Sequence, residues 1–346
     1  MIFPKCMIGR APQVTYHGYV LPCCWTDYDE QIDYLYGDKK LKKQNKFLRE
    51  EFNLYNNKIK DILESPEWSE MLQSIFYDTP KKCKRKCGKF FVKNKQIDSH
   101  NNEVPKIDPS KTNLNEHMST ISTDETIFWN DVEKFRSQKN RLQLETTTRC
   151  TLACPYCTRT KQAGTGAYYK ADLSLQIMED ILNYKSWEQI IDCGRYGDSV
   201  FYKYFYEMLT ILQNSSVERY QLHNAATGRG ISWWEKIIDK MIEIQNSGTT
   251  IQNIFGIDGL ENTSHIHRVN QDWNEITTAM RLSKEAGLET VWQFIPFRQN
   301  ENQINQVKEL ADKWGVKLIF SISNRFDGPD DPMLPFDSKL HTYNLT

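Results

Sequence analysis

Three cysteines in one short segment form the densest group of potential metal ligands in the sequence. Cys150, Cys154 and Cys157 lie in LETTTRCTLACPYCTR with the spacing C-x3-C-x2-C. Soft thiolates bind iron–sulfur clusters, zinc or copper. Three thiolates leave one corner of a four-iron cluster without a protein ligand, and an open position is what catalysis requires. The alternative is a structural zinc site, whose usual spacing pairs C-x2-C with a second such pair or with two histidines. No such pair follows, so the spacing favours a cluster.

The cysteine segment directly follows the first strand of an alternating strand and helix pattern that starts at Arg141. Such alternation indicates parallel βα units, which right-handed crossovers curl into a full or partial barrel. Functional side chains then belong at the C-terminal ends of the strands. The predicted strands are 141–147, 189–193, 219–223, 250–258, 289–296 and 316–322, and the predicted helices are 175–184, 200–213, 232–245, 271–286 and 301–314.

Smaller signals support these elements and add candidate residues. Ser174 is a predicted N-cap, and Gly287 and Gly315 each follow a predicted helix, as helix-ending glycines do. Gln293 is a substrate or cofactor contact if it faces inward, and otherwise a polar side chain buried against a helix. Cys193 is expected to be a small core residue, and His265 and His267 are expected to be solvated loop histidines rather than a metal site.

Five further cysteines lie near the N-terminus and suggest a second metal site. The basic run 81–95, with eight Lys or Arg in fifteen residues, surrounds two of them. This run is either a nucleic-acid-binding patch or, as we favour, a solvated surface that offsets the charge of a four-thiolate cluster. A zinc ribbon is the alternative to a cluster here. The N-terminal cysteines are Cys6, Cys23, Cys24, Cys83 and Cys87.

The segment CTLACPYC after a first strand resembles the signature of the radical S-adenosylmethionine (radical SAM) superfamily, C-x3-C-x-aromatic-C. The resemblance implies a partial (β/α)6 barrel in which Cys150, Cys154 and Cys157 hold a 4Fe–4S cluster and Tyr156 lies against the adenine of the cofactor. S-adenosylmethionine would bind the fourth iron through its amino and carboxylate groups. One electron would then cleave it to methionine and a 5′-deoxyadenosyl radical, which abstracts a substrate hydrogen.

Two later strand ends also resemble this family. Gly197 and Asp198 lie in a turn similar to the family's GGEP turn, which approaches the cofactor's ammonium, although Asp and Ser stand here for the usual Glu and Pro. The alternative is an ordinary turn in which Asp198 caps the next helix. Asp258 ends a strand similar to the family's "siDG" strand, and Arg268 is either a fork for the cofactor carboxylate or a surface arginine.

The N-terminal cysteines resemble the auxiliary-cluster modules of the same superfamily, SPASM and the shorter twitch form, although those modules usually follow the barrel. The resemblance implies one auxiliary 4Fe–4S cluster, with Cys24 left over or exchanging with Cys23. Enzymes with such modules mostly modify peptides or proteins, and some act on small molecules. A ferredoxin or flavodoxin is the implied reductant. The four implied ligands of the auxiliary cluster are Cys6, Cys23, Cys83 and Cys87.

The whole chain is expected to be a cytoplasmic α/β enzyme of oxidoreductase or transferase type. Its net charge of −1 gives no global basic signature, and no segment approaches a signal peptide or a membrane span. The alternatives are a radical SAM enzyme that modifies nucleic acids or nucleotides and a zinc-stabilised, non-catalytic binding protein. The expected divisions are an auxiliary module at 1–96, a polar linker at 97–140, a barrel at 141–326 and a C-terminal tail at 327–346.

Overall fold

The computed structural model describes residues 11–23, 47–77, 140–163, 170–184, 187–225, 227–323, 326 and 330–341. The chain divides into two compact units, Met1–Gln143 and Leu144–Thr346. Within the described ranges, no helix is both long and apolar enough to cross a membrane.

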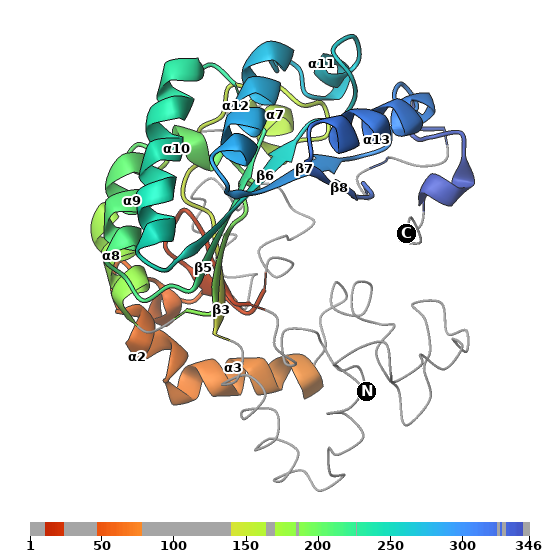
Figure 1. Ribbon diagram of the computed structural model, residues 1–346. Coiled ribbons are helices and arrows are strands. Elements are labelled where there is room, and N and C mark those ends of the chain that lie inside the picture. The colour runs from red at the N-terminus through yellow and green to blue at the C-terminus, as the bar shows by residue number, and fades with distance from the viewer. Residues whose placement is uncertain are drawn as a thin grey trace, which may run out of the picture. The chain divides into compact units, whose positions relative to one another are not determined.

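The second unit is built on an open, parallel sheet whose strands follow the order of the chain (Figure 1). Strands β4 to β8 each pair in parallel with the next, and the N–H of Cys193, just after β4, donates to the carbonyl of Leu144 at 3.0 Å. The predicted α/β class with a parallel, partial barrel is confirmed, and the sheet does not close. Strand β3 (Arg141–Leu144) spans the boundary between the two units, and the later strands are β4 (Gln189–Asp192), β5 (Arg219–Asn224), β6 (Thr250–Gly256), β7 (Glu289–Phe294) and β8 (Lys317–Phe320).

Helices cover one face of this sheet (Figure 1). On that face the indole of Trp292 in β7 packs against Trp273, with ring centroids 6.3 Å apart, and stacks on Trp314 at 5.7 Å. Because neighbouring side chains in a strand alternate between faces, Gln293 points to the opposite, inner face. The helices are α7 (Thr158–Ala163), α8 (Leu175–Tyr184), α9 (Phe205–Gln213), α10 (Ile231–Asn246), α11 (Ser264–His267), α12 (Trp273–Glu285) and α13 (Ile304–Lys313), with 3-10 helices η5 (Ser199–Phe201), η6 (Glu301–Gln303) and η7 (Ser338–His341).

The ends of these helices follow local sequence signals. The hydroxyl of Ser174 accepts the N–H of Ile177 at 3.2 Å, so it caps α8 as predicted. Gly287 and Gly315 have φ of 79° and 62°, which suits glycine after α12 and α13. The predicted helix 200–213 is wrong in its first part, because extended backbone at Tyr202, with ψ of 130°, separates η5 from α9.

The described part of the first unit contains a small hairpin and short helices. Strand β1 (Gln13–Val14) pairs antiparallel with β2 (Val20–Leu21), and Gly18 between them has φ of 79°. The hairpin is followed by η3 (Glu50–Phe52), α2 (Ile59–Leu63) and α3 (Pro66–Tyr77).

A single helix from Lys39 to Leu63, which the apolar spacing predicts, is wrong over residues 47–58 of its described part, whereas α2 (Ile59–Leu63) ends at the predicted residue. Asn53 accepts the N–H of Tyr55 at 2.9 Å, and the amide of Asn57 donates to the carbonyl of Glu51 at 3.2 Å. Asparagine side chains that bond nearby main chain in this way compete with the helical hydrogen bonds. Ser65-Pro66, a pair that by itself suggests a turn, is the start of α3, because the Ser65 hydroxyl accepts the N–H of Trp68 at 3.1 Å.

Candidate functional site

The three cysteines of the central motif lie on one loop at the C-terminal end of the sheet and surround one small apolar cluster. Cys154 is buried together with Leu152 and Ala225, and the half-buried Cys150 and Cys157 pack against them. Ala225 directly follows β5, so residues from different strand ends meet here. The structure therefore brings the three predicted thiols to the edge where functional residues of parallel sheets gather.

The first half of this cysteine loop is held by two neighbouring connections. The Thr151 hydroxyl donates to the carbonyl of Thr227 at 2.6 Å. The N–H of Ala153 donates to the carbonyl of Val269 at 3.0 Å, and the side-chain amide of Asn270 donates to the carbonyl of Thr151 at 3.3 Å. These bonds fix the path of the loop without using a cysteine side chain, and the Cys150 thiol separately accepts the N–H of Leu152 at 3.4 Å.

Burial disfavours the charged form of these thiols. It raises the pKa of Cys150 to about 12, with the nearby Asp198 carboxylate adding to the rise. Burial also raises the pKa of Cys154, and the Arg268 guanidinium offsets part of that rise. Metal ligation requires the thiolates, so loading this site must release protons and supply positive charge.

Three cysteine thiols suit a soft metal centre, either an iron–sulfur cluster or a single ion. In the part of the chain that the structure describes, no three His, Cys, Asp or Glu side chains are gathered as ligands of one metal ion. A tetrahedral ion with bonds of about 2.3 Å needs thiolates about 3.8 Å apart. A cubane cluster instead binds each thiolate through a different iron, so its cysteines stand further from one another.

The turn after β4 lies against the start of the cysteine loop. A Cβ at Gly197 would come within 2.7 Å of the carbonyl oxygen of Arg149, so only glycine permits this approach. The N–H of Asp198 donates to the same carbonyl at 2.8 Å. The Asp198 carboxylate accepts the N–H groups of Val200 at 3.3 Å and Ala225 at 2.7 Å. Asp198 therefore caps η5, as the alternative interpretation holds, and also links this turn to β5.

Two buried acids that the sequence did not single out also position these loops. Glu145 is 1% exposed and accepts the N–H groups of Arg195 at 3.0 Å and Tyr196 at 3.3 Å. Glu275 on α12 accepts three consecutive main-chain N–H groups after β5, from Gly228 at 2.8 Å, Arg229 at 3.1 Å and Gly230 at 3.0 Å. An acid in the first turn of a helix is a common sequence feature, so this signal does not mark a loop anchor by itself.

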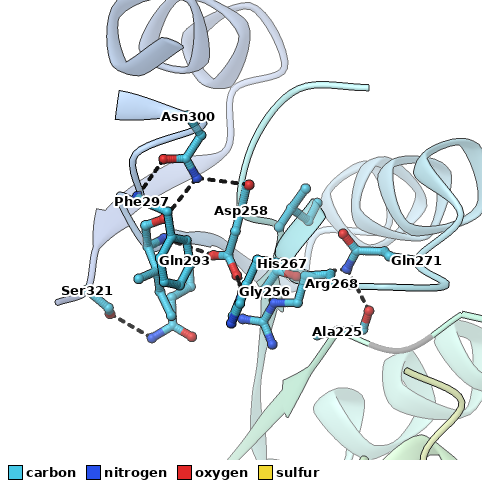
Figure 2. A network of polar contacts seen from close by, with 12 residues as sticks. Ala225, Gly256, Asp258, His267, Arg268, Gln271, Gln293, Phe297, Asn300 and Ser321 are labelled. Atoms are coloured by element: carbon cyan, nitrogen blue, oxygen red, sulfur yellow. Dashed lines mark hydrogen bonds and ion pairs between the residues drawn. The ribbon is translucent and has the colours of Figure 1, made fainter. Parts of the chain in front are cut away.

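Asp258, at the end of β6, is the centre of a buried polar network (Figure 2). Its Oδ2 accepts hydrogen bonds from Arg268 Nε at 2.6 Å and His267 Nδ1 at 2.8 Å, and its Oδ1 accepts the N–H of Ile295 at 2.9 Å. Burial alone would raise the pKa of Asp258, but the charge of Arg268 and the bond from His267 outweigh it, so the net pKa is lowered. Asp258 is therefore an ionised anchor.

Arg268 is placed by this anchor beside the cysteine loop. Its guanidinium occupies space that a side chain on Gly256 would fill, since a Cβ there would lie 2.8 Å from Arg268 Nη2. The same Cβ would lie 3.2 Å from the Cβ of Ala225, which packs in one cluster with Cys154, so the guanidinium lies next to that cluster. With Nε bound to Asp258, both terminal nitrogens remain as donors that bond no other residue in the described ranges. The surface-arginine alternative is wrong, because the Arg268 side chain is only 17% exposed.

The expectation of solvated loop histidines is correct in the exposure of His265 and wrong for the burial of His267, and both residues lie on the short helix α11 rather than on a loop. His265 is exposed, whereas His267 is 7% exposed and lies on α11 with its ring 4.1 Å from that of Phe297. Burial of His267 follows from its bond to Asp258, a contact between residues nine positions apart that no local pattern announces.

Amide side chains hold the strand ends around this network (Figure 2). Asn300 donates to the carbonyls of Asp258 at 2.9 Å and Ile295 at 3.0 Å. Gln271 donates to the carbonyls of Ala225 at 2.7 Å and Gly256 at 3.0 Å, which joins the ends of β5 and β6.

Gln293 and Cys193 complete the predicted residues of the sheet. Gln293 lies on the inner face and donates to the Ser321 hydroxyl at 2.7 Å, as Figure 2 shows. Cys193 is half-buried beyond the end of β4, and its thiol donates to the carbonyl of Ile191 at 3.4 Å.

Tyr156 extends from the second half of the cysteine loop into a group of aromatic rings. Its ring centroid lies 6.4 Å from that of His267 and 6.0 Å from that of Phe326, which meets it edge-on. Its hydroxyl donates a short hydrogen bond to Asp331 Oδ1. Phe297 packs against both His267 and Phe326. Three aromatic rings from separate segments thus lie next to Tyr156 of the motif or next to one another.

The predicted auxiliary site falls mostly outside the described residues. Cys23 is described and is 4% exposed. Cys6, Cys24, Cys83, Cys87 and the basic run 81–95 lie outside the described ranges.

No family model and no curated protein matches this chain. Among solved structures, Streptococcus suis SuiB bound to S-adenosylmethionine matches at 12% identity over 64% of this chain and 51% of its own, with a TM-score of 0.41. The native anSMEcpe structure with bound AdoMet matches at 13% identity over 53% of this chain and 51% of its own, with a TM-score of 0.42. SuiB bound to its precursor peptide SuiA covers 73% of this chain and 50% of its own at 13% identity, with a TM-score of 0.36.

This chain spans about half the length of the solved structures that it matches. Two of those structures hold the cofactor that the sequence resemblance implies. With identities below 15% and TM-scores below 0.5, however, we take no activity from them and argue the function from this chain's own residues.

Proposed function

We propose that this chain is a radical S-adenosylmethionine enzyme that holds a 4Fe–4S cluster with Cys150, Cys154 and Cys157. The chemistry supplied by the bound cluster and cofactor is one-electron cleavage of S-adenosylmethionine to methionine and a 5′-deoxyadenosyl radical, which takes a hydrogen atom from the substrate. The protein's part is to bind, to orient and to exclude water.

The observation that carries this proposal is the meeting of the cysteine loop with Arg268 at one end of a parallel sheet. The three thiols share one cluster of apolar side chains, and a guanidinium fixed by a buried carboxylate lies beside Ala225 of that cluster. A structural zinc site needs a fourth ligand and no such arginine. An open metal corner beside a cationic fork instead suits a ligand that binds the metal and carries a carboxylate.

Each neighbouring residue has a role in this arrangement. Arg268 would hold the carboxylate of the cofactor with its two terminal nitrogens, while Asp258 keeps the guanidinium in place. The turn at Gly197 and Asp198 would present main-chain carbonyls to the ammonium group, since both oxygens of the Asp198 carboxylate accept main-chain N–H groups. Tyr156 would pack against the adenine.

We propose a peptide or protein, rather than a small molecule, as the substrate. This choice depends on the resemblance of the N-terminal cysteines to auxiliary-cluster modules, with Cys6, Cys23, Cys83 and Cys87 as ligands and Cys24 as a possible substitute. The proposed divisions are the module at 1–96, the linker at 97–140, the barrel at 141–326 and the tail at 327–346. A ferredoxin or flavodoxin would supply the electron.

The test is formation of 5′-deoxyadenosine from S-adenosylmethionine by anaerobically reconstituted, dithionite-reduced protein. Cys154→Ala serves as the negative variant and Cys193→Ala as the matched control, since Cys193 lies outside the motif. Formation by the wild type and by Cys193→Ala, but not by Cys154→Ala, would support the proposal. Zinc without inorganic sulfide in anaerobically purified protein would refute it.

A further inference from the structure

The C-terminal segment 330–341 of the second unit contacts the cysteine loop through Asp331. Asp331 is 6% exposed, and its Oδ1 accepts hydrogen bonds from the Tyr156 hydroxyl and from the N–H of Met333, the latter at 2.9 Å. The two bonded side chains are 175 positions apart in the chain. A buried carboxylate thus faces the one aromatic residue that the motif carries between its second and third cysteines.

Asp331 is itself held firmly by the connection that follows β7. Arg298 donates to three main-chain carbonyls of this segment. Its own main-chain N–H bonds Met333 at 3.0 Å, its Nε bonds Leu334 at 3.0 Å and its Nη2 bonds Asp331 at 3.1 Å. Glu301 accepts the N–H groups of Phe336 at 3.2 Å and Asp337 at 3.1 Å. Because these partners belong to the connection between β7 and α13, Asp331 is fixed relative to the sheet.

The bond to Asp331 complements the anchors of the cysteine loop. Thr151 and Ala153 tie the first half of the loop to the strand ends. In the second half, Pro155 is exposed, and Tyr156 reaches inward to the aromatic rings and to Asp331. Ring packing against His267 and Phe326 permits the Tyr156 ring to slide, whereas a hydrogen bond at its hydroxyl fixes its far end. A hydrogen bond from a hydroxyl to a carboxylate is charge-assisted, so it is stronger than a bond between two neutral groups.

We propose that Asp331 is a positioning residue of the cofactor site, which holds the Tyr156 ring in the orientation that receives the adenine of S-adenosylmethionine. The inference rests on the proposed function. Asp331 acts through its bond with Tyr156. A ring fixed before binding spares the entropy of ordering it upon binding, so the expected benefit is in affinity.

The experiment measures the affinity of anaerobically reconstituted protein for S-adenosylmethionine by titration calorimetry, and the rate at which a chelator removes iron. The variants are Asp331→Ala, Tyr156→Phe, their combination, and Glu301→Gln, which weakens the hold on Phe336 and Asp337. The matched control is Asp330→Ala, which removes an exposed acid one position away. We expect Asp331→Ala and Tyr156→Phe each to weaken binding about tenfold, or about 1.4 kcal/mol. The combined variant should bind S-adenosylmethionine no more weakly than the weaker-binding single variant, because both changes remove the same bond. Asp330→Ala should bind it as tightly as the wild type.

The outcomes separate this inference from its alternatives. Tyr156→Phe keeps the ring and removes the same bond from the other side, so the test survives even if Asp331→Ala misfolds. Equal affinity and equal iron loss in wild type, Asp331→Ala and Tyr156→Phe would overturn the inference. The inference would also be overturned if Asp331→Ala and Glu301→Gln weakened binding but Tyr156→Phe did not. The affinity would then depend on the position of the whole segment 330–341 and not on the bond between Tyr156 and Asp331. Wild-type protein that builds no iron–sulfur cluster would instead refute the proposed function.

Discussion

Replacing Asp258 with alanine should destabilise the second unit strongly, because it leaves buried donors without their acceptor. The variant removes the partners of Arg268 Nε at 2.6 Å, His267 Nδ1 at 2.8 Å and the Ile295 N–H at 2.9 Å. The Arg268 side chain, 17% exposed, would keep its charge without a counter-ion. Breaking such a buried pair from one side costs about 3–5 kcal/mol.

Urea unfolding of the apo protein under reducing conditions measures this cost, and a double-mutant cycle identifies its origin. Arg268→Met removes the charge and keeps an unbranched side chain. The combined Asp258→Ala/Arg268→Met variant should therefore lose less than the sum of the single losses, by about 2 kcal/mol. Asp239→Ala, on the exposed side of α10, is the control and should change the free energy of unfolding by less than about 0.5 kcal/mol. A loss below about 1 kcal/mol for Asp258→Ala, or strict additivity in the double variant, would refute the account of Asp258 as a charge-compensating anchor.

Three other substitutions test other parts of the site. Gly197→Ala should lower the iron bound per chain after reconstitution. Its Cβ would lie 2.7 Å from the carbonyl oxygen of Arg149, so the main chain would have to shift at a cost of about 1–3 kcal/mol. A normal iron content would contradict this prediction. Burial raises the pKa of Asp192 to about 7 from 3.8. Its contribution to stability is therefore present below about pH 4 and lost as pH rises to about 7, at 1.36 kcal/mol per pKa unit. Asp192→Asn should thus be more stable than wild type at pH 8, by at most about 4 kcal/mol, and similar at pH 4 in urea unfolding; a gain that is equal at both pH values would disprove the linkage. Glu275→Gln should cost about 1–2 kcal/mol of unfolding free energy, since an amide has one acceptor oxygen for three N–H groups; no loss would show that the loop after β5 does not depend on them.

The sheet could be predicted because its signals are local. Strands 219–223 and 250–258 begin at the predicted residues, and α8 (Leu175–Tyr184) has its predicted bounds. Gly287 and Gly315 end helices as expected, since a positive φ is a property of the residue itself. The misplaced helices fail where a side chain bonds its own neighbourhood, as Asn53 does, or where backbone turns between two helical stretches, as at Tyr202.

The candidate site could be located from the sequence, but its connections could not. The cysteine spacing indicates where the ligands lie along the chain, and a strand end indicates that Asp258 matters. His267 belongs to α11 and Ile295 directly follows β7, so only the fold brings these two partners to the oxygens of Asp258. Asp331 lies in what the sequence suggests to be a mere tail, and nothing near it in the chain points to Tyr156. The predicted ligand roles themselves stay predictions.

The three indoles on the helix-covered face of the sheet give the protein an optical reporter that is independent of iron. Trp292 and Trp314 stack at 5.7 Å with an interplanar angle of 24°, and Trp273 lies 6.3 Å from Trp292. Chromophores this close and fixed in a chiral frame couple electronically, so they should give a strong circular dichroism band in the near ultraviolet. The band should disappear when α12 and α13 separate from β7, whereas visible absorption follows only the cluster. Assembly of the metal centre and formation of the protein scaffold can therefore be followed as two separate signals in one sample.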